Sequence, residues 1–139
     1  MVLRYGEYVP LNAKKDDINL EERVLAFARY SLQETAIIAT NVNDIETQFY
    51  IDYSPLQNIY KETYSNHTVI MVTDWLKPDT PAQYYFLKEL LSLRSQIRLR
   101  PYTSTVLGFT ICSIDGDQFV IRKALMQSLE RTKQKLTSG

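Results

Sequence analysis

The feature that most constrains this sequence is a succession of short segments with strand periodicity, separated by turn residues. The clearest segment runs from Glu46 to Tyr53, where Phe49, Ile51 and Tyr53 point one way and the residues between them point the other. A period of two residues is that of a strand in a sheet with one buried face and one solvated face. Such segments, joined by short turns, predict antiparallel pairing rather than a parallel sheet.

Six further segments are rich in β-branched and aromatic residues. The segment Thr35–Asn41 is apolar on both faces, so we expect it in the centre of a sheet, and the short connector before it predicts a hairpin with the preceding strand. The polar stretch Asn12–Glu22 is expected to be a loop, and 56–66 to be irregular. The six expected strands are Leu3–Leu11, Arg23–Tyr30, Thr35–Asn41, Thr68–Thr73, Ile97–Arg100 and Thr103–Ile111.

Two segments have helical spacing instead. Thr80 as N-cap, Pro81 at the first helical position and Gln83 closing a capping box predict a helix over about 81–94, with an apolar face that includes Tyr84 and Leu87. A second helix is expected over about 118–136. Four residues are expected to line its apolar side and to pack on a sheet, on the other helix or on a neighbouring domain: Ile121, Leu125, Leu129 and Leu136.

The fold class expected from these elements is mainly β: an antiparallel, Greek-key-like β-sandwich with one inserted helix and one C-terminal helix. The 139 residues are the length of a single domain and can bury one hydrophobic core. Without an internal repeat or a low-complexity segment, residues 1–139 are expected to form one domain, either alone or as the accessory β-domain of a larger protein.

Charge and cysteine content narrow the classes of partner. Lys and Arg number 16, as do Asp and Glu, whereas a nucleic-acid binder is expected to show a basic excess. The cations that cluster near the C-terminus, from Arg122 to Lys135, are expected on the solvated face of a helix. No stretch reaches the roughly 18 apolar residues of a membrane span. The single cysteine forbids an intrachain disulfide, and Met1–Gly6 does not resemble a signal peptide, which together favour a cytoplasmic setting.

Residue types that carry chemistry are present but not arranged as an active site. The paired carboxylates, Asp16–Asp17, Glu21–Glu22 and Asp115 with Asp117, fall in loop or turn signals and are expected to be solvated or capping. Cys112 lies in an apolar run and is expected to be a buried structural thiol. One histidine, His67, cannot form a metal cluster, and four glycines form no phosphate loop. We therefore expect no catalytic residue, metal or cofactor in this chain.

Three segments, in order, resemble the C-terminal β-domain of the α-amylase family of glycoside hydrolases and transglycosidases. The first, Leu3–Leu11, is similar to the leucine-arginine-x-glycine-x-aromatic strand that enters that domain. The second, Val24–Arg29 followed by Ala36–Asn41, is similar to a hairpin whose strands end in arginine and asparagine. The third, Ile97–Leu107, is similar to the closing strands, where a proline-aromatic step precedes an aliphatic run. Pro101 is expected to break this segment so that the chain moves to the second sheet.

The resemblance implies a non-catalytic domain that stabilises a catalytic barrel of the same polypeptide or shapes its substrate cleft. The acidic residues of that chemistry belong to a barrel of roughly 250 residues, which this chain cannot contain. The two expected helices depart from the family pattern. The parent enzyme, its substrate and the oligomeric state are left open by the sequence.

Two alternatives remain. The chain could be a carbohydrate-binding module that stacks exposed tyrosines on an α-glucan, and the five candidate rings are Tyr5, Tyr8, Tyr50, Tyr60 and Tyr64. It could also be a protein-interaction domain without a sugar role, if its helices leave an apolar patch uncovered. The sequon Asn66-His67-Thr68 would matter only in a secreted protein.

Overall fold

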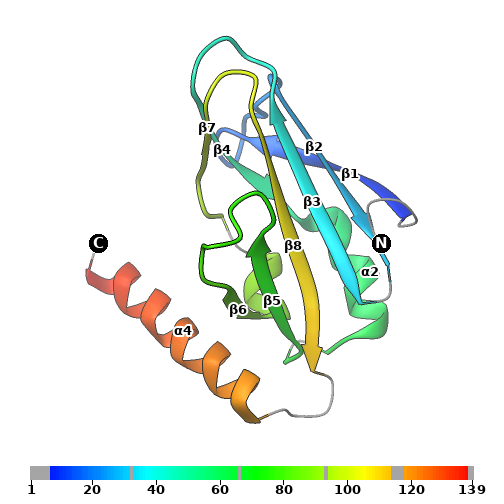
Figure 1. The fold of residues 1–139 in the computed structure, drawn as a ribbon, viewed down its shortest axis with the longest axis vertical. Coiled ribbons are helices and arrows are strands. Elements are labelled where there is room, and N and C mark those ends of the chain that lie inside the picture. The colour runs from blue at the N-terminus through cyan, green and yellow to red at the C-terminus, as the bar shows by residue number, and fades with distance from the viewer. Residues whose placement is uncertain (1–6, 32, 66, 93, 114–117, 138–139) are drawn as a thin grey trace.

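Over the residues that the structure describes, the chain folds into one curled, antiparallel sheet of eight strands with three helices (Figure 1). The structure is a computed structural model that describes residues 7–31, 33–65, 67–92, 94–113 and 118–137. The elements are β1 (Glu7–Lys14), β2 (Val24–Tyr30), β3 (Glu34–Asn41), β4 (Thr47–Asp52), α2 (Ser54–Thr63), β5 (Val69–Asp74), β6 (Gln83–Phe86), α3 (Leu87–Leu91), β7 (Ile97–Leu99), β8 (Ser104–Ser113) and α4 (Gln118–Thr137).

The strand order is β6-β5-β8-β3-β2-β1-β4-β7, so β1 to β4 form a Greek key. The strand β1 turns the corner of the sheet. Its first half pairs with β2, up to Leu11 opposite Ala26, and its second half pairs with β4, from Asn12 opposite Asp52. The expected antiparallel, mainly β fold is confirmed, and β3 lies in the centre of the sheet as its two apolar faces predicted. The expected loop Asn12–Glu22 is wrong at its start, because β1 continues to Lys14.

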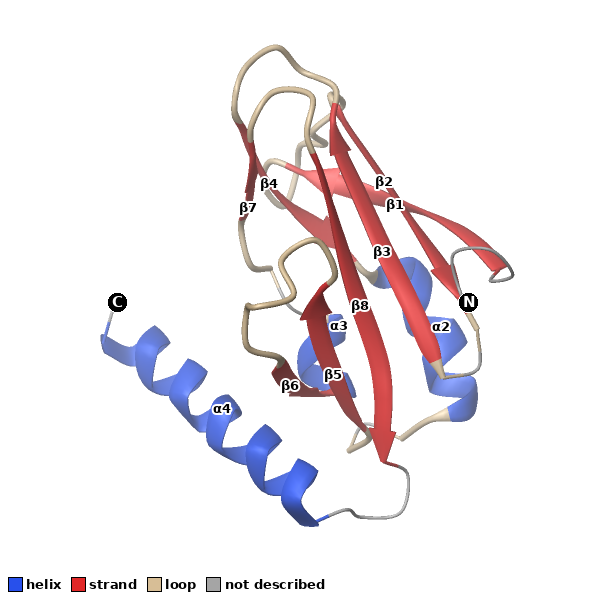
Figure 2. Cartoon of the chain, in the orientation of Figure 1, coloured by secondary structure: helices blue, strands red, loops and turns tan. Residues whose placement is uncertain are grey.

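The hydrophobic core lies inside the curl, where the β4 end of the sheet faces β3, β5 and β8. Phe49 and Ile51 of β4 belong to the same buried cluster as Ile37 and Phe109, and the rings of Tyr53 and Phe109 meet edge to face at 5.5 Å. The short helices α2 and α3 fill the inside of the curl (Figure 2). The predicted break at Pro101 is confirmed, because β7 pairs with β4 whereas β8 pairs with β3 and β5. The two strands belong to one curled sheet rather than to the two sheets of a sandwich.

The helix predicted over about 81–94 is largely wrong. Residues 83–86 form the strand β6, which pairs with β5 from Val72 opposite Gln83 to Val69 opposite Phe86. Helix begins only at Leu87, and α3 ends at Leu91. Three consecutive aromatic residues fit the pleated surface of a strand, and pairing with β5 satisfies those of their backbone groups that face β5. Thr80 does not cap a helix; its N–H closes a turn onto the carbonyl of Lys77 at 3.0 Å.

The stretch expected to be irregular contains the helix α2. Pro55 lies in its first turn, a position where the missing N–H of proline costs nothing. Leu56 and Tyr60, four residues apart, are buried on its inner face. The hydroxyl groups of Tyr60 and Thr35 form a hydrogen bond that ties α2 to β3.

The C-terminal helix α4 is confirmed, but its packed face differs from the prediction. Leu125 and Leu129 are exposed, whereas Ala124 is fully buried against the sheet. Two side chains of α4 satisfy the free edge of β6: Gln127 accepts a hydrogen bond from the N–H of Tyr84 at 2.6 Å, and Arg131 donates one to the Tyr84 carbonyl at 3.0 Å. The helix therefore covers an edge strand through polar contacts rather than through its leucines.

Arg131 anchors α4 to β6 and α3. Its guanidinium donates to both carboxylate oxygens of Glu89, at 3.0 and 2.6 Å, and lies 4.0 Å from the centre of the Tyr85 ring. Both charged side chains are about three-quarters buried. The expectation that the C-terminal cations are all solvated is therefore wrong for Arg131.

Candidate functional site

The outer face of the sheet, opposite the core, carries a continuous apolar and aromatic surface. Residues directly opposite one another in an antiparallel ladder point to the same face. The register aligns Pro10, Phe27, Ile38 and Val106 in one row across four strands. We call this surface the outer-face patch; it comprises Tyr8, Leu25, Phe27, Arg29, Ile38, Trp75 and Val106.

Trp75 reaches the patch from the turn after β5 and lies directly on Gly108 of β8. A Cβ atom at residue 108 would lie 2.0 Å from the indole Nε1, so only glycine admits the ring here. The N–H of Trp75 donates to the Val106 carbonyl at 2.9 Å, which fixes the start of the turn. Ala36, paired with Gly108 on this same face, is fully buried. The indole therefore extends the patch across β8.

At the other end of the patch, Tyr8 packs on Phe27 and Arg29. The rings of Tyr8 and Phe27 lie 5.4 Å apart at a tilt of 33°, and the Arg29 guanidinium carbon lies 5.6 Å from the centre of the Tyr8 ring. Tyr8 is 56% exposed and Leu25 is 59% exposed. The patch thus combines aromatic rings, aliphatic side chains and one arginine, the residue types enriched in protein interfaces.

The helices leave the outer-face patch uncovered. The main contacts of α2 are with β1 and α3, and its Tyr60 also bonds to Thr35 of β3. The helix α3 packs on β5 and β6, and α4 runs along β6 and β5. Figure 2 shows α2 and α3 behind the sheet and α4 to one side of it. Among the described residues, Tyr8 and Leu25 on this face are therefore more than half exposed.

The structure separates the five tyrosines that the sequence proposed as sugar-stacking rings. Tyr8 is exposed, as expected, and Tyr64 is half-buried. The expected exposure of Tyr50 and Tyr60 is wrong, since both are buried. Arg94 and the loop after β1 contact Tyr50, and Tyr60 belongs to the inner face of α2. Tyr5 lies outside the described residues.

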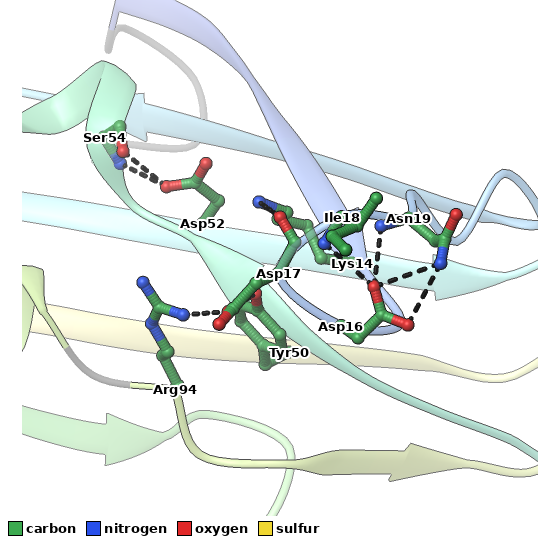
Figure 3. Close-up of polar contacts among 9 residues, drawn as sticks. All are labelled: Lys14, Asp16, Asp17, Ile18, Asn19, Tyr50, Asp52, Ser54 and Arg94. Carbon is green, nitrogen blue, oxygen red and sulfur yellow. Dashed lines mark hydrogen bonds and ion pairs between the residues drawn. The ribbon is translucent and has the colours of Figure 1, made fainter.

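A polar cluster lies where β1 ends beside β4 (Figure 3). The Tyr50 hydroxyl donates to the Asp17 carboxylate at 2.9 Å, and Arg94 forms an ion pair with the same carboxylate. Asp52 accepts hydrogen bonds from the backbone and the hydroxyl of Ser54 at the start of α2. Through these contacts the carboxylates hold the loop after β1 and the start of α2 in place.

The pKa values in this cluster follow from those contacts. Hydrogen bonds from the side chain and backbone of Asn19 and from the backbone of Ile18 hold the pKa of Asp16 below its usual value. Burial opposes ionisation of Asp52, but hydrogen bonds from Ser54 outweigh it and lower the pKa. Desolvation and the nearby charges of Asp52 and Asp16 raise the pKa of Tyr50. Asp16 and Asp52 are therefore ionised at neutral pH.

The other candidate groups take the places expected of structural residues. Cys112 departs from the expected burial, since it is half-buried, with its thiol 3.7 Å from the Thr110 carbonyl. His67 lies in an exposed turn before β5, as expected. Glu21 accepts a hydrogen bond from the Arg23 N–H. Asp115 and Asp117 lie outside the described residues, and so does Asn66 of the sequon.

Among the described residues, no group of three or more His, Cys, Asp or Glu side chains could hold a metal ion. Within the same residues, no helix has both the length and the apolar character needed to cross a bilayer.

Sequence reasoning missed Phe27, Ile38 and Trp75 as surface residues. The sequence did contain a pattern that indicates them. Because β2 and β3 carry apolar residues on both sides, the outer face of the sheet also favours burial against a partner. The position of Trp75 over Gly108 joins residues 33 positions apart, which no local pattern reveals.

The sequence matches no model of a known protein family, and it matches no curated protein. Among solved structures, the chain is similar to the crystal structure of a proposed alpha-N-acetylgalactosaminidase from Bacillus halodurans. The two share 14% identity with a TM-score of 0.46, over 76% of this chain and 22% of that chain. The match therefore spans about a fifth of that protein's length.

Proposed function

We propose that this chain is a non-catalytic accessory domain of an α-amylase-like, carbohydrate-active protein. In this proposal the outer-face patch docks onto the catalytic (β/α)8 barrel, and the docked domain stabilises the barrel or shapes its substrate cleft. The observation that carries the proposal is the uncovered patch on the sheet, with Leu25 and Tyr8 more than half exposed.

An apolar patch of this kind favours burial against a second protein surface. Contiguous exposed apolar surface on a sheet is uncommon in soluble monomers and marks interaction sites. The register also spreads the patch over four neighbouring strands, β1, β2, β3 and β8. A surface that is broad and nearly flat suits a large rigid partner better than a peptide or a small ligand, which prefer grooves and pockets.

The segments that resemble the α-amylase C-terminal domain form these same strands. The first contributes Tyr8 of β1, the second contributes Phe27 and Ile38 of the β2–β3 hairpin, and the third contributes Val106 of β8. The two departures from the family pattern, the β6–α3 unit and α4, lie away from the patch at the other edge of the sheet. The resemblance and the patch therefore point to the same surface.

The first test is the reading frame of the transcript that encodes this chain. We expect it to encode a (β/α)8 barrel on the N-terminal side of these residues. We also expect the chain expressed alone to show no α-glucan hydrolysis. A transcript without a barrel, or turnover by the isolated chain with retained stereochemistry, would overturn the proposal.

The second test uses the two-domain protein with one charge placed on the patch. Leu25→Glu is expected to lower the melting temperature of the barrel or to split one calorimetric transition into two, because a carboxylate would be buried at the contact. The matched control is Ile45→Glu, which changes an equally exposed apolar residue off the patch. Equal melting curves for the two variants would contradict docking through this face.

A carbohydrate-binding module remains the second candidate because Tyr8 is an exposed ring beside an arginine. The 33° tilt between Tyr8 and Phe27 does not give the flat platform of coplanar rings that a glucan chain stacks on. Affinity electrophoresis through a glycogen-containing gel separates the two functions. Retardation of the isolated chain that disappears in Tyr8→Ala would favour sugar binding; migration unaffected by glycogen is expected for a docking domain.

A further inference from the structure

The loop after β1 presents an exposed apolar knob surrounded by acidic side chains. Ile18 is 89% exposed at its tip, and Leu20 is about half exposed beside it. Residues 15–22, which we call the acidic knob, hold four carboxylates and one lysine, for a formal charge of −3. An isoleucine so exposed among carboxylates has no role in the core of its own chain.

Hydrogen bonds hold the acidic knob in one shape (Figure 3). One carboxylate oxygen of Asp16 accepts from the N–H groups of Ile18 and Asn19, at 2.9 and 2.7 Å. The Lys15 N–H donates to the Asn19 carbonyl at 2.9 Å, and the Glu21 N–H donates to the Ala13 carbonyl at 2.9 Å. A loop that is already ordered loses little conformational entropy when it binds, so Ile18 is presented in a form ready for contact.

The outward side of α4 has the complementary character. Met126 and Leu129 are 68% and 66% exposed, and they line a groove of about 590 Å³ flanked by Lys123 and Lys133. The helix holds five cations and one glutamate, for a formal charge of +4. Glu130, Gln127 and Thr132 complete the lining, and among the described residues only those of α4 line the groove.

Charge decides which part of a second copy fits this groove. Two α4 helices placed face to face would bring Lys123 and Lys133 of one copy against the same cations of the other, which is repulsive. The acidic knob instead offers carboxylates to the two lysines and an aliphatic side chain to Met126 and Leu129. Arg94 pairs with one carboxylate of the knob and Glu89 pairs with Arg131 of the helix, so a net charge of −2 on the knob (−3 + 1) faces +3 on the helix (+4 − 1). Opposite charges of this kind steer association and fix orientation.

We propose that copies of this chain associate head to tail, with Ile18 of the acidic knob of one copy inserted into the α4 groove of the next. The contact is heterologous, so it closes into a dimer or ring when two copies engage reciprocally and extends otherwise. This contact involves neither Leu25 nor the rest of the outer-face patch, so it can be tested independently of the accessory-domain proposal.

The test is sedimentation velocity of the purified chain over a range of concentrations. Wild type is expected to associate as concentration rises, and Ile18→Asp or Met126→Asp is expected to raise the dissociation constant by at least about tenfold. Ile45→Asp, which alters an exposed residue outside both surfaces, is the matched control. Raising the salt concentration from about 50 to about 500 mM is also expected to weaken association, because it screens the charges.

A mixture of the two variants separates this contact from nonspecific association. Ile18→Asp retains an intact groove and Met126→Asp retains an intact knob, so the mixture is expected to form a heterodimer but nothing larger. Circular dichroism establishes that each variant is folded, and Glu22→Lys, an exposed change, provides a second weakening variant. Wild type that stays monomeric, association unaffected by Ile18→Asp, or α4 binding to anionic vesicles in place of a second copy would overturn the proposal.

Discussion

Asn41 ties three parts of the fold together, and replacing it should cost more stability than its size implies. The side chain is fully buried at the end of β3. Its amide nitrogen donates to the carbonyls of Ile45, Leu99 and Arg100 at 3.0 to 3.2 Å, and its oxygen accepts from the Asn43 N–H at 2.9 Å. These contacts join the β3–β4 turn to the end of β7.

The magnitude follows from the number of bonds lost. An amide nitrogen has two hydrogens, so its three carbonyl partners share two donors, and the accepted bond makes a third. At about 1 kcal/mol net for each, Asn41→Ala should lower the free energy of unfolding by about 3 kcal/mol. For a domain of this size, that loss lowers the melting temperature by about 10 °C. The neighbouring variant Thr40→Ala, which loses one exposed hydrogen bond to Ser104, should cost less than about 1 kcal/mol.

Asn41→Asp sharpens the test because it keeps the shape and the acceptor but removes both donors. The introduced carboxylate would face carbonyl oxygens in a buried site, which raises its pKa in the folded state above the unfolded value. The folded state then binds more protons, so stability falls as pH rises through that window and recovers at lower pH relative to wild type. At neutral pH this variant should be less stable than Asn41→Ala.

Urea denaturation followed by far-ultraviolet circular dichroism, repeated from about pH 4 to about pH 7, measures both effects. A loss below about 1 kcal/mol for Asn41→Ala would refute the bond-counting argument. If the difference in unfolding free energy between wild type and Asn41→Asp does not change with pH, the amide is not the donor to these carbonyls.

Three further predictions concern other parts of the fold. Gly108→Ala should lower the free energy of unfolding by about 1–3 kcal/mol, because the added Cβ would displace the Trp75 indole. In a Trp75→Ala background the same substitution should have almost no effect. Arg131→Ala should lower the free energy of unfolding by about 2 kcal/mol and reduce the hydrogen-exchange protection of α4, because Glu89 loses both bonds from the guanidinium. Arg131→Lys should recover only part of this free energy. Burial raises the pKa of Tyr60 to about 12, so stability should be full below about pH 10 and fall above it, with a smaller alkaline loss in Tyr60→Phe.

Strand periodicity predicted most of the sheet because burial on one face leaves its mark within a single strand. The alternation from Glu46 to Tyr53 became β4, and the apolar run from Thr35 to Asn41 became the central strand β3. What periodicity cannot supply is the partner on each side. That β1 leaves β2 for β4 at Asn12 depends on the curl of the whole sheet.

The two helix errors have a common physical cause, the ambiguity of short aromatic and apolar runs. Tyr84 and Leu87 have helical spacing, yet residues 83–86 pair with the edge of β5. This pairing cannot be predicted from the local sequence. Conversely, residues 56–66 were expected to be irregular, although Leu56 and Tyr60 four residues apart fit one face of a helix. Tertiary pairing decided the first case, and spacing could have decided the second.

The candidate site was harder to predict because exposure depends on neighbours. Tyr50 lies on the side of β4 expected to be wet, but Asp17 and Arg94 come from distant segments to cover it. In α4 the leucine stripe predicted burial, whereas the contacts with Tyr84 and Glu89 turned the Ala124 and Arg131 face inward. Long-range polar contacts thus overrode the apolar pattern.

The position of the only tryptophan has a practical consequence for both proposed contacts. Trp75 is half-buried on the outer face, and its indole N–H end lies against Gly108. Its fluorescence therefore reports on this surface without a label. A partner that excludes water from the outer-face patch should shift the emission to shorter wavelength. Association through the α4 groove, on another part of the surface, should leave the spectrum unchanged. One intrinsic signal can thus distinguish the two surfaces without a label.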